Sequence, residues 1–199
     1  MKKKLIAASN NENKILEIKS ILSDTSFNVL SLKDACINVE PKETSTSFEG
    51  NAIIKARATA ALTDHIVIAD DSGLEVDCLD GAPGVISKRF AGINSSDNDN
   101  NQYLIKKLKR LNFKRYPARF VCVIAFIDEN RNEKTFKGIC EGEIVMEPAG
   151  DNGFGYDPFF YISELNKTMA QLNDSQKNSI SHRGNALKLL HTYLKGINK

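Results

Sequence analysis

Two adjacent carboxylates, Asp70 and Asp71, are the first candidates for chemistry in this sequence. They follow a short apolar run, residues 65–69, and precede Ser72 and Gly73. A run of this length bounded by turn residues predicts a buried strand that ends at the two acids. Ligands of open α/β sheets bind beyond such strand ends, and adjacent acids favour a nearby cation or donor cluster. A plain strand-to-turn junction, in which Asp, Ser and Gly bond locally, is the alternative.

A second polar junction separates a predicted first strand, residues 5–8, from a helix whose apolar face carries Ile15, Ile18 and Leu22. Free amides at a helix start, small polar side chains and a lysine in the first turn suit a polyphosphate. The glycines of a Walker A loop are missing, and a well-capped strand–helix junction is the alternative. The predicted phosphate-binding residues are Ser9, Asn10, Asn11, Glu12, Asn13 and Lys14.

A glycine-rich segment, residues 148–158, carries Phe154 and Tyr156 among three glycines. Glycine allows close backbone approach, and an aromatic ring on such a loop suits stacking on a planar ligand. Packing of both rings in the core is the alternative. Further along, His182 and Arg183 open the last predicted helix, where positive charge opposes the helix dipole. An anionic or electron-rich partner would offset that cost.

These residues need strands and helices to position them. Further strands are predicted at residues 28–31, 74–76, 120–127 and 135–146, the last two as an antiparallel hairpin in the middle of the sheet. A capping box at Thr46 and Glu49 predicts an Ala-rich helix with Asn51 and Lys55 on one face, and another helix begins near Ser96. This alternation predicts an α/β fold with a mixed sheet, as one domain over residues 1–199.

Composition limits the function. The chain of 199 residues has a formal net charge of +2, which argues against strong attraction to nucleic acid or membrane. No stretch approaches the length of a membrane span, and the apolar run after the basic N-terminus is too short for a signal peptide. The four cysteines show no C-x-x-C pair or zinc spacing, which indicates core residues in a reducing compartment. We therefore expect a cytoplasmic protein.

Six stretches together resemble one family, the inosine/xanthosine triphosphate pyrophosphatases. They occur in the family's order, nearly end to end: Ser9-x-Asn11-x-x-Lys14-x-x-Glu17, Asn51-Ala52-x-x-Lys55-Ala56, Ala69-Asp70-Asp71-Ser72-Gly73-Leu74, Gly81-x-Pro83-Gly84 with Ser87-x-Arg89-Phe90-x-Gly92, Gly153-Phe154-Gly155-Tyr156-Asp157-Pro158, and Ser181-His182-Arg183-Gly184. The resemblance implies an elongated mixed β-sheet flanked by helices, two lobes with a central cleft, a homodimer, and dependence on Mg²⁺. It also implies hydrolysis of ITP, dITP or XTP to the monophosphate and pyrophosphate.

The resemblance also implies roles for individual residues. Asp71 matches the family's proton acceptor, and Glu43 and Asp71 match its metal-linked acids. Asp70 is a second catalytic candidate, because the two aspartates can divide the work of metal ligand and base. Residues 9–14 and Lys55 match the triphosphate contacts. The family's other nucleotide-binding positions fall on Ser72, Phe154, Gly155, Tyr156, Asp157, Lys177, His182 and Arg183.

The chain departs from the family at Gly50, where many members have Glu before the Asn-Ala pair, which bears on the metal shell. Donors such as Arg183 and loop amides would favour the O6 acceptor of hypoxanthine or xanthine over the amino group of adenine. Three rival functions stay open. They are a pyrophosphatase for other modified bases, a non-catalytic nucleotide-binding module, and a HAD-like phosphatase with Asp70 as nucleophile, which lacks the expected Asp-x-Asp spacing.

Overall fold

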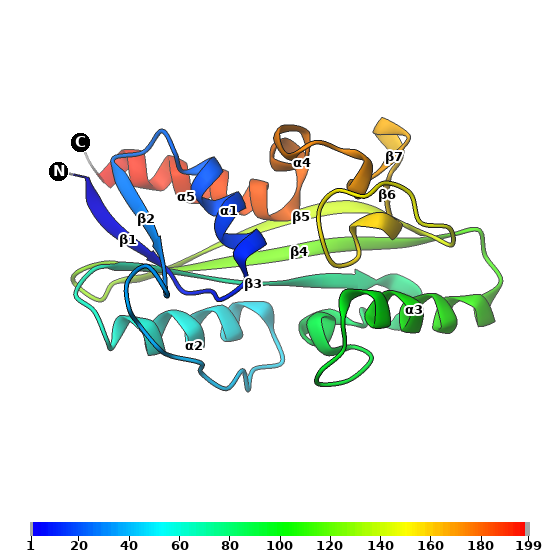
Figure 1. Cartoon of the computed structure of the whole chain (residues 1–199), viewed down its shortest axis with the longest axis horizontal. Coiled ribbons are helices and arrows are strands. Elements are labelled where there is room, and N and C mark those ends of the chain that lie inside the picture. The colour runs from blue at the N-terminus through cyan, green and yellow to red at the C-terminus, as the bar shows by residue number, and fades with distance from the viewer. Residues whose placement is uncertain (1, 198–199) are drawn as a thin grey trace. The chain divides into compact units, whose positions relative to one another are not determined.

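The computed structural model describes residues 2–197, which form a mixed sheet flanked by helices (Figure 1). The strands are β1 (Lys3–Ala7), β2 (Phe27–Ser31), β3 (Ile66–Val76), β4 (Arg115–Ile127), β5 (Glu133–Val145), β6 (Phe160–Ile162) and β7 (Lys167–Thr168). The helices are α1 (Glu12–Ile21), α2 (Phe48–Ala60), α3 (Asp97–Leu108), α4 (Asp174–Ile180) and α5 (His182–Ile197). These elements confirm the predicted α/β class.

The seven strands are ordered β2-β1-β3-β4-β5-β6-β7. Strand β1 pairs in parallel with β2 and β3, whereas β6 pairs antiparallel with β5 and β7. The chain divides into two compact units: unit 1 comprises Met1–Asp71, Cys122–Gly138 and His182–Lys199, and unit 2 comprises Ser72–Val121 and Ile139–Ser181. Strands β3, β4 and β5 contribute residues to both units, and each unit has its own hydrophobic core.

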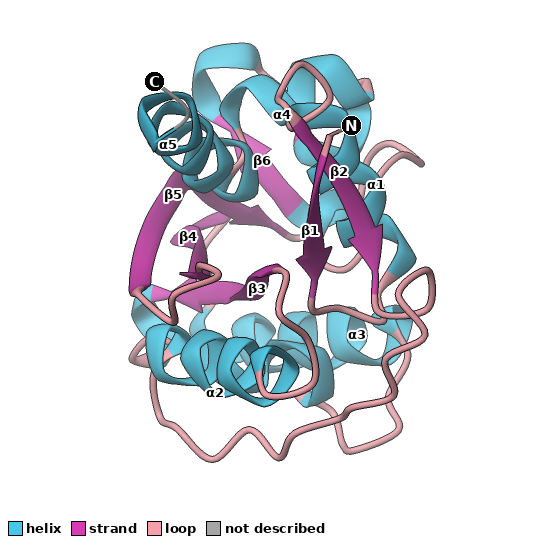
Figure 2. Ribbon diagram, turned by 90° about the vertical axis from the view of Figure 1, so that its left-hand side faces the viewer, coloured by secondary structure: helices cyan, strands magenta, loops and turns pink. Residues whose placement is uncertain are grey.

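In unit 1, helices α1 and α5 pack on one face of the strands. The predicted apolar face of α1, with Ile15, Ile18 and Leu22, is buried in this core. Asn11 caps α1, because its Oδ1 accepts a hydrogen bond from the backbone N of Lys14 at 3.2 Å. Helix α2 lies on the opposite side of β3 from α5 (Figures 1 and 2). Side chains from either side therefore reach β3.

Strand β3 differs from its prediction. The strand was expected to end at the two aspartates, but Ile66–Val76 is one continuous strand and no turn occurs there. A turn is unnecessary because cationic side chains of neighbouring elements pair with both buried carboxylates. The aspartates therefore lie in the middle of a strand.

Two smaller predictions are also wrong. The N-cap of α2 is Ser47 rather than Thr46, and the Oγ of Ser47 accepts from the N of Gly50 at 3.1 Å. Two of the four cysteines, Cys36 and Cys78, are exposed rather than in the core. The predicted start of α3 is confirmed, with Ser96 as N-cap in a capping box. No helix in residues 2–197 is long and apolar enough to cross a membrane.

Gly138 of β5 fixes the start of α5. A Cβ at this position would lie 2.2 Å from the carbonyl O of His182 and 2.3 Å from the N of Ala186. We expect Gly138→Ala to destabilise the protein by about 1–3 kcal/mol, because the helix must move away. Urea denaturation measures the effect.

The matched control is Gly196→Ala near the end of the same helix, where a Cβ meets nothing within 4 Å. This variant should be as stable as wild type or gain up to about 1 kcal/mol of helix propensity. Equal stability of both variants would contradict the close approach of Gly138 to α5.

Candidate active site

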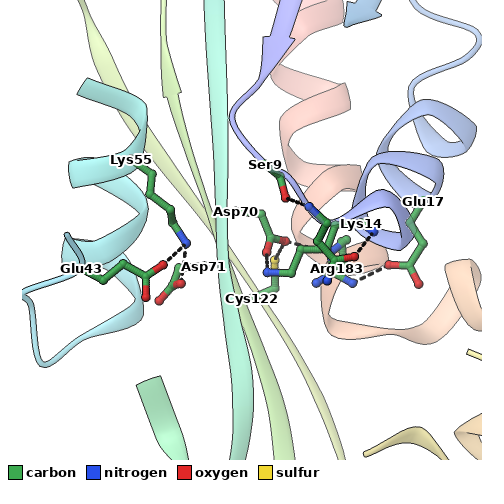
Figure 3. Close-up of polar contacts among 10 residues, drawn as sticks. Ser9, Lys14, Glu17, Glu43, Lys55, Asp70, Asp71, Cys122 and Arg183 are labelled. Atoms are coloured by element: carbon green, nitrogen blue, oxygen red, sulfur yellow. Dashed lines mark hydrogen bonds and ion pairs between the residues drawn. The ribbon is translucent and has the colours of Figure 1, made fainter. Parts of the chain in front are cut away.

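Strand alternation separates the two aspartates. Successive side chains of a strand point to opposite faces, so Asp70 shares the face of Ile66 and Ile68, toward α1 and α5. Asp71 points the other way, toward α2. Figure 3 shows the two groups of partners on either side of β3. The neighbours in sequence therefore belong to two different clusters.

Asp70 is the centre of a buried ion-pair cluster. Its side chain is 0 % exposed, and its Oδ1 accepts from the Nζ of Lys14. Its Oδ2 accepts from the Nε of Arg183 at 2.8 Å and from the Sγ of Cys122 at 3.0 Å. The Nη1 of Arg183 also donates to Glu17. Side chains from α1, α5 and β4 thus contact one carboxylate of β3.

Electrostatics keep Asp70 ionised. Burial opposes ionisation, but the positive charges of Arg183 and Lys14 outweigh it and hold the pKa of Asp70 well below its ordinary value. Burial, with the charge of Asp70, raises the pKa of the Cys122 thiol well above its ordinary value, so this thiol stays protonated and donates. A carboxylate so strongly paired is a poor proton acceptor at neutral pH.

Asp71 lies in a second cluster with Lys55 and Glu43. The Nζ of Lys55 is 2.6 Å from the Oδ1 of Asp71 and 3.1 Å from the Oε1 of Glu43. Burial raises the pKa of Asp71, against the opposing effect of the Lys55 charge. Burial lowers the pKa of Lys55, but the charge and hydrogen bond of Asp71 and the charges of Glu43 and Asp70 together outweigh burial and raise it. The Oδ2 of Asp71 is buried and has no hydrogen-bond partner, so Asp71 retains an acceptor.

The loop that carries Glu43 is anchored to the start of α2. The N of Ser45 donates to the Oδ1 of Asn51 at 2.9 Å, and Asn51 is fully buried. A Cβ at Gly50 would lie 2.1 Å from the Oγ of Ser45 and 2.7 Å from its Cβ. The absence of a side chain at Gly50 therefore permits the packing of this loop.

The predicted phosphate-binding segment lies at the start of α1. The Oγ of Ser9 accepts from the N of Asn11 at 3.1 Å, which shapes the turn into the helix. Asn10, Glu12 and Asn13 are exposed. Lys14, in the first turn, directs its ammonium to Asp70. The segment and the Asp70 cluster are thus linked through one lysine.

Unit 2 holds the predicted aromatic loop. The Oδ2 of Asp157 accepts from the Nζ of Lys177 at 2.7 Å and from the N of Phe154 at 3.0 Å. The Lys177 ammonium lies 4.5 Å from the centroid of the half-buried Phe154 ring. Gly153 has a φ of +76°, and a Cβ there would lie 2.1 Å from the Oδ2 of Asp157. The carboxylate, the ammonium and the ring form one packed cluster.

Two expectations for this loop change. The side chain of Tyr156 is buried, and its hydroxyl donates to the carbonyl O of Ser87 at 2.8 Å, so the core-packing alternative holds for this ring. The N of Gly155 donates to the Oδ2 of Asp97 at 2.7 Å, as the N of Phe154 does to Asp157. These two amides are therefore occupied by carboxylates of unit 2.

Sequence analysis missed Cys122 and assigned no role to Glu17. Cys122 lies in a strand predicted only as buried, and nothing in its type or spacing indicates contact with Asp70. Glu17 carried a signal, because it follows Lys14 by three residues and so shares its face of α1. Both residues complete the surroundings of one buried carboxylate.

The protein therefore has an α/β fold with a capped strand–helix junction, a buried ion-pair cluster around Asp70, and two carboxylates, Asp71 and Glu43, that share Lys55. The Ham1 family model matches residues 5–193. A dITP/XTP pyrophosphatase of Staphylococcus aureus is 46% identical over 194 residues, which cover 98% of this chain and 97% of that protein. The chain belongs to the Ham1 family.

Solved structures agree with this assignment. The Staphylococcus aureus Ham1 protein superposes with a TM-score of 0.86 at 46% identity, covering 98% of this chain and 100% of that one. A HAM1 protein from Coxiella burnetii gives a TM-score of 0.88 at 40% identity, covering 98% and 99% of the two chains.

Removal of the Asp70 charge should destabilise the fold. We expect Asp70→Asn to cost about 3–5 kcal/mol, because Arg183 and Lys14 lose their buried counter-ion. The lowered pKa of Asp70 gives the sign of the pH dependence. The deficit is full above a pH of about 4, the unfolded pKa, and shrinks as pH falls through the folded pKa. Chemical denaturation of both proteins across pH measures it.

The control is Glu129→Gln, which removes an exposed pair with Lys3. Solvent screens such pairs, so this variant should unfold close to wild type at every pH. If Asp70→Asn behaves in the same way, the Asp70 cluster does not stabilise the fold.

Proposed function

We propose that this chain is a dITP/XTP pyrophosphatase that hydrolyses ITP, dITP and XTP to the nucleoside monophosphate and pyrophosphate. The names of close relatives over nearly the whole chain support the substrate class. The observation that carries the chemistry is Asp71, a buried carboxylate with a raised pKa and one oxygen without a hydrogen-bond partner.

A polar segment and two lysines of unit 1 are suited to binding a triphosphate. The proposed contacts are Ser9, Asn10, Asn11, Glu12, Asn13 and Lys14 at the start of α1, with Lys55 of α2. Phosphoryl transfer depends on positioning and charge stabilisation rather than on a strong nucleophile. The polar side chains at the start of α1 and two lysines provide both. This supports binding of the phosphates in unit 1.

The donor set also fits Mg²⁺. Within the described residues, no group of three or more His, Cys, Asp and Glu side chains could hold a metal ion. Mg²⁺ is often held by one or two carboxylates, with waters and substrate phosphates as the other ligands. Glu43 and Asp71 are such a pair, and the Oδ2 of Asp71 is an unused acceptor. Bound Mg²⁺ would neutralise phosphate charge and polarise a phosphoryl oxygen.

The two aspartates have different roles in this proposal. Asp71 orients a water and accepts its proton while the water oxygen attacks the α-phosphorus. The bond from that phosphorus to the bridging oxygen breaks, and pyrophosphate leaves. Asp70 keeps Lys14 and Arg183 in position and is not a catalytic residue. The HAD-like alternative, with Asp70 as nucleophile, loses support because this carboxylate is buried among its cations.

Base recognition involves the other positions matched to the family, Ser72, Phe154, Gly155, Tyr156, Asp157, Lys177, His182 and Arg183. Phe154 stacks on the base, and the cationic donors Lys177 and Arg183 favour an O6 acceptor. Each of these cations is fixed by a buried carboxylate, Asp157 or Asp70. Adenine would leave such donors facing its amino group. Guanine also carries O6, so discrimination against GTP must depend on the 2-amino group of guanine. The resemblance further supports a cytoplasmic homodimer of one domain.

Asp71→Asn is the direct test of the catalytic role. We expect turnover of dITP with Mg²⁺ to fall by a factor on the order of 10²–10⁴, the usual contribution of a general base, while the protein stays folded. Product analysis by ion exchange separates the functions. Pyrophosphate supports the proposal, orthophosphate would favour a phosphatase, and binding without turnover would leave a nucleotide-binding module.

Selectivity is tested by kcat/KM for ITP and ATP. We expect a preference for ITP approaching about 10⁴, because a site built to bond O6 is left with unpaired buried donors by adenine. Pyrophosphate release in a coupled assay measures both. Equal kcat/KM values for ITP and ATP would refute recognition through O6 but would not contradict the proposed hydrolytic centre.

A further inference from the structure

Lys55 bridges Glu43 and Asp71, the two carboxylates that the proposed function assigns to Mg²⁺. Its ammonium contacts the Oδ1 of Asp71 and the Oε1 of Glu43, at 2.6 and 3.1 Å. The Lys55 side chain is only 16% exposed, so water screens these contacts weakly. The three residues form a compact cluster with two negative charges and one positive charge.

A divalent ion held by Glu43 and Asp71 would use the same two carboxylate groups. Mg²⁺ binds oxygen at about 2.0–2.1 Å, closer than any ammonium. A metal on Asp71 and Glu43 would therefore share ligands with the Lys55 ammonium, and two cations at such short range repel strongly. The ammonium and the metal therefore cannot both make close contacts with the two carboxylates at the same time.

The lysine is the member of this cluster that can move. Asp71 belongs to a continuous strand, and the Glu43 loop is anchored through Ser45 to the buried Asn51. The ammonium of Lys55 stands at the end of a flexible four-carbon stem. Its departure needs only side-chain rotation, whereas the backbone positions of Asp71 and of the Glu43 loop are fixed.

We propose that Lys55 is an internal counter-ion of the metal site, which holds Glu43 and Asp71 in the free protein and passes to the triphosphate when metal and nucleotide bind. The proposal rests on the proposed function, since it needs metal at these carboxylates. It implies that the free protein binds Mg²⁺ weakly. It also implies that metal and nucleotide bind cooperatively, because the phosphates give the displaced ammonium a new partner.

The test is a calorimetric titration of nucleotide-free protein with Mg²⁺ at pH 8. Lys55→Met keeps an unbranched side chain and removes the competing charge. This variant should bind Mg²⁺ on the order of tenfold more tightly than wild type, because no ammonium competes for the carboxylates. An affinity equal to or weaker than wild type would overturn the proposal.

Lys14→Met is the matched control, because Lys14 pairs with Asp70 on the opposite face of β3. Its Mg²⁺ affinity should stay within about twofold of wild type, since only long-range charge changes. A gain equal to that of Lys55→Met would show a general charge effect and contradict direct competition.

Wild-type protein gives a second measurement, in which a conservative variant serves only to assign one signal. The ammonium NMR signal of Lys55, identified by its loss in Lys55→Arg, should be ordered without metal and become solvent-averaged on saturation with Mg²⁺. An unchanged signal would overturn the proposal. Normal pyrophosphate release with either negative result would refute only the lysine exchange. Absent release would refute the proposed function, whatever the titration gives.

Discussion

The site depends on the alternation of side chains along β3. Because successive residues of a strand face opposite ways, Asp70 and Asp71 cannot share one environment. Asp70 faces two cations and a thiol, and its pKa falls well below the ordinary value. Asp71 faces one lysine and a second carboxylate, and its pKa is raised. One residue of register thus separates a buried counter-ion from the proposed proton acceptor.

A second regularity is that lysines matched to nucleotide binding are each held by a buried aspartate. Lys14 pairs with Asp70, Lys55 with Asp71, and Lys177 with Asp157. Such pairing fixes a flexible ammonium before any ligand arrives and avoids an uncompensated buried charge. It also means that a polyanion must compete with the protein's own carboxylates. This competition matters most for Lys55, because its partner Asp71 is the proposed proton acceptor.

Much of this arrangement could be predicted from sequence. The start of α1, the hairpin of β4 and β5 and the mixed sheet follow from periodicity and capping residues. The Asp70–Asp71 turn was wrongly predicted, because Asp, Ser and Gly signal a turn locally. The strand is stabilised instead by Lys14, Arg183 and Lys55, which lie far away in the sequence. The contact of Cys122 with Asp70 carries no local signal at all. Ion pairs between residues far apart in the sequence were therefore the part of the structure that local sequence patterns could not predict.

The central claim is that water attacks the α-phosphorus of a purine nucleoside triphosphate. Hydrolysis of dITP in ¹⁸O-labelled water, followed by mass spectrometry of both products, tests it directly. We expect one ¹⁸O atom in the nucleoside monophosphate and none in pyrophosphate. Label in pyrophosphate, or release of labelled orthophosphate, would contradict it.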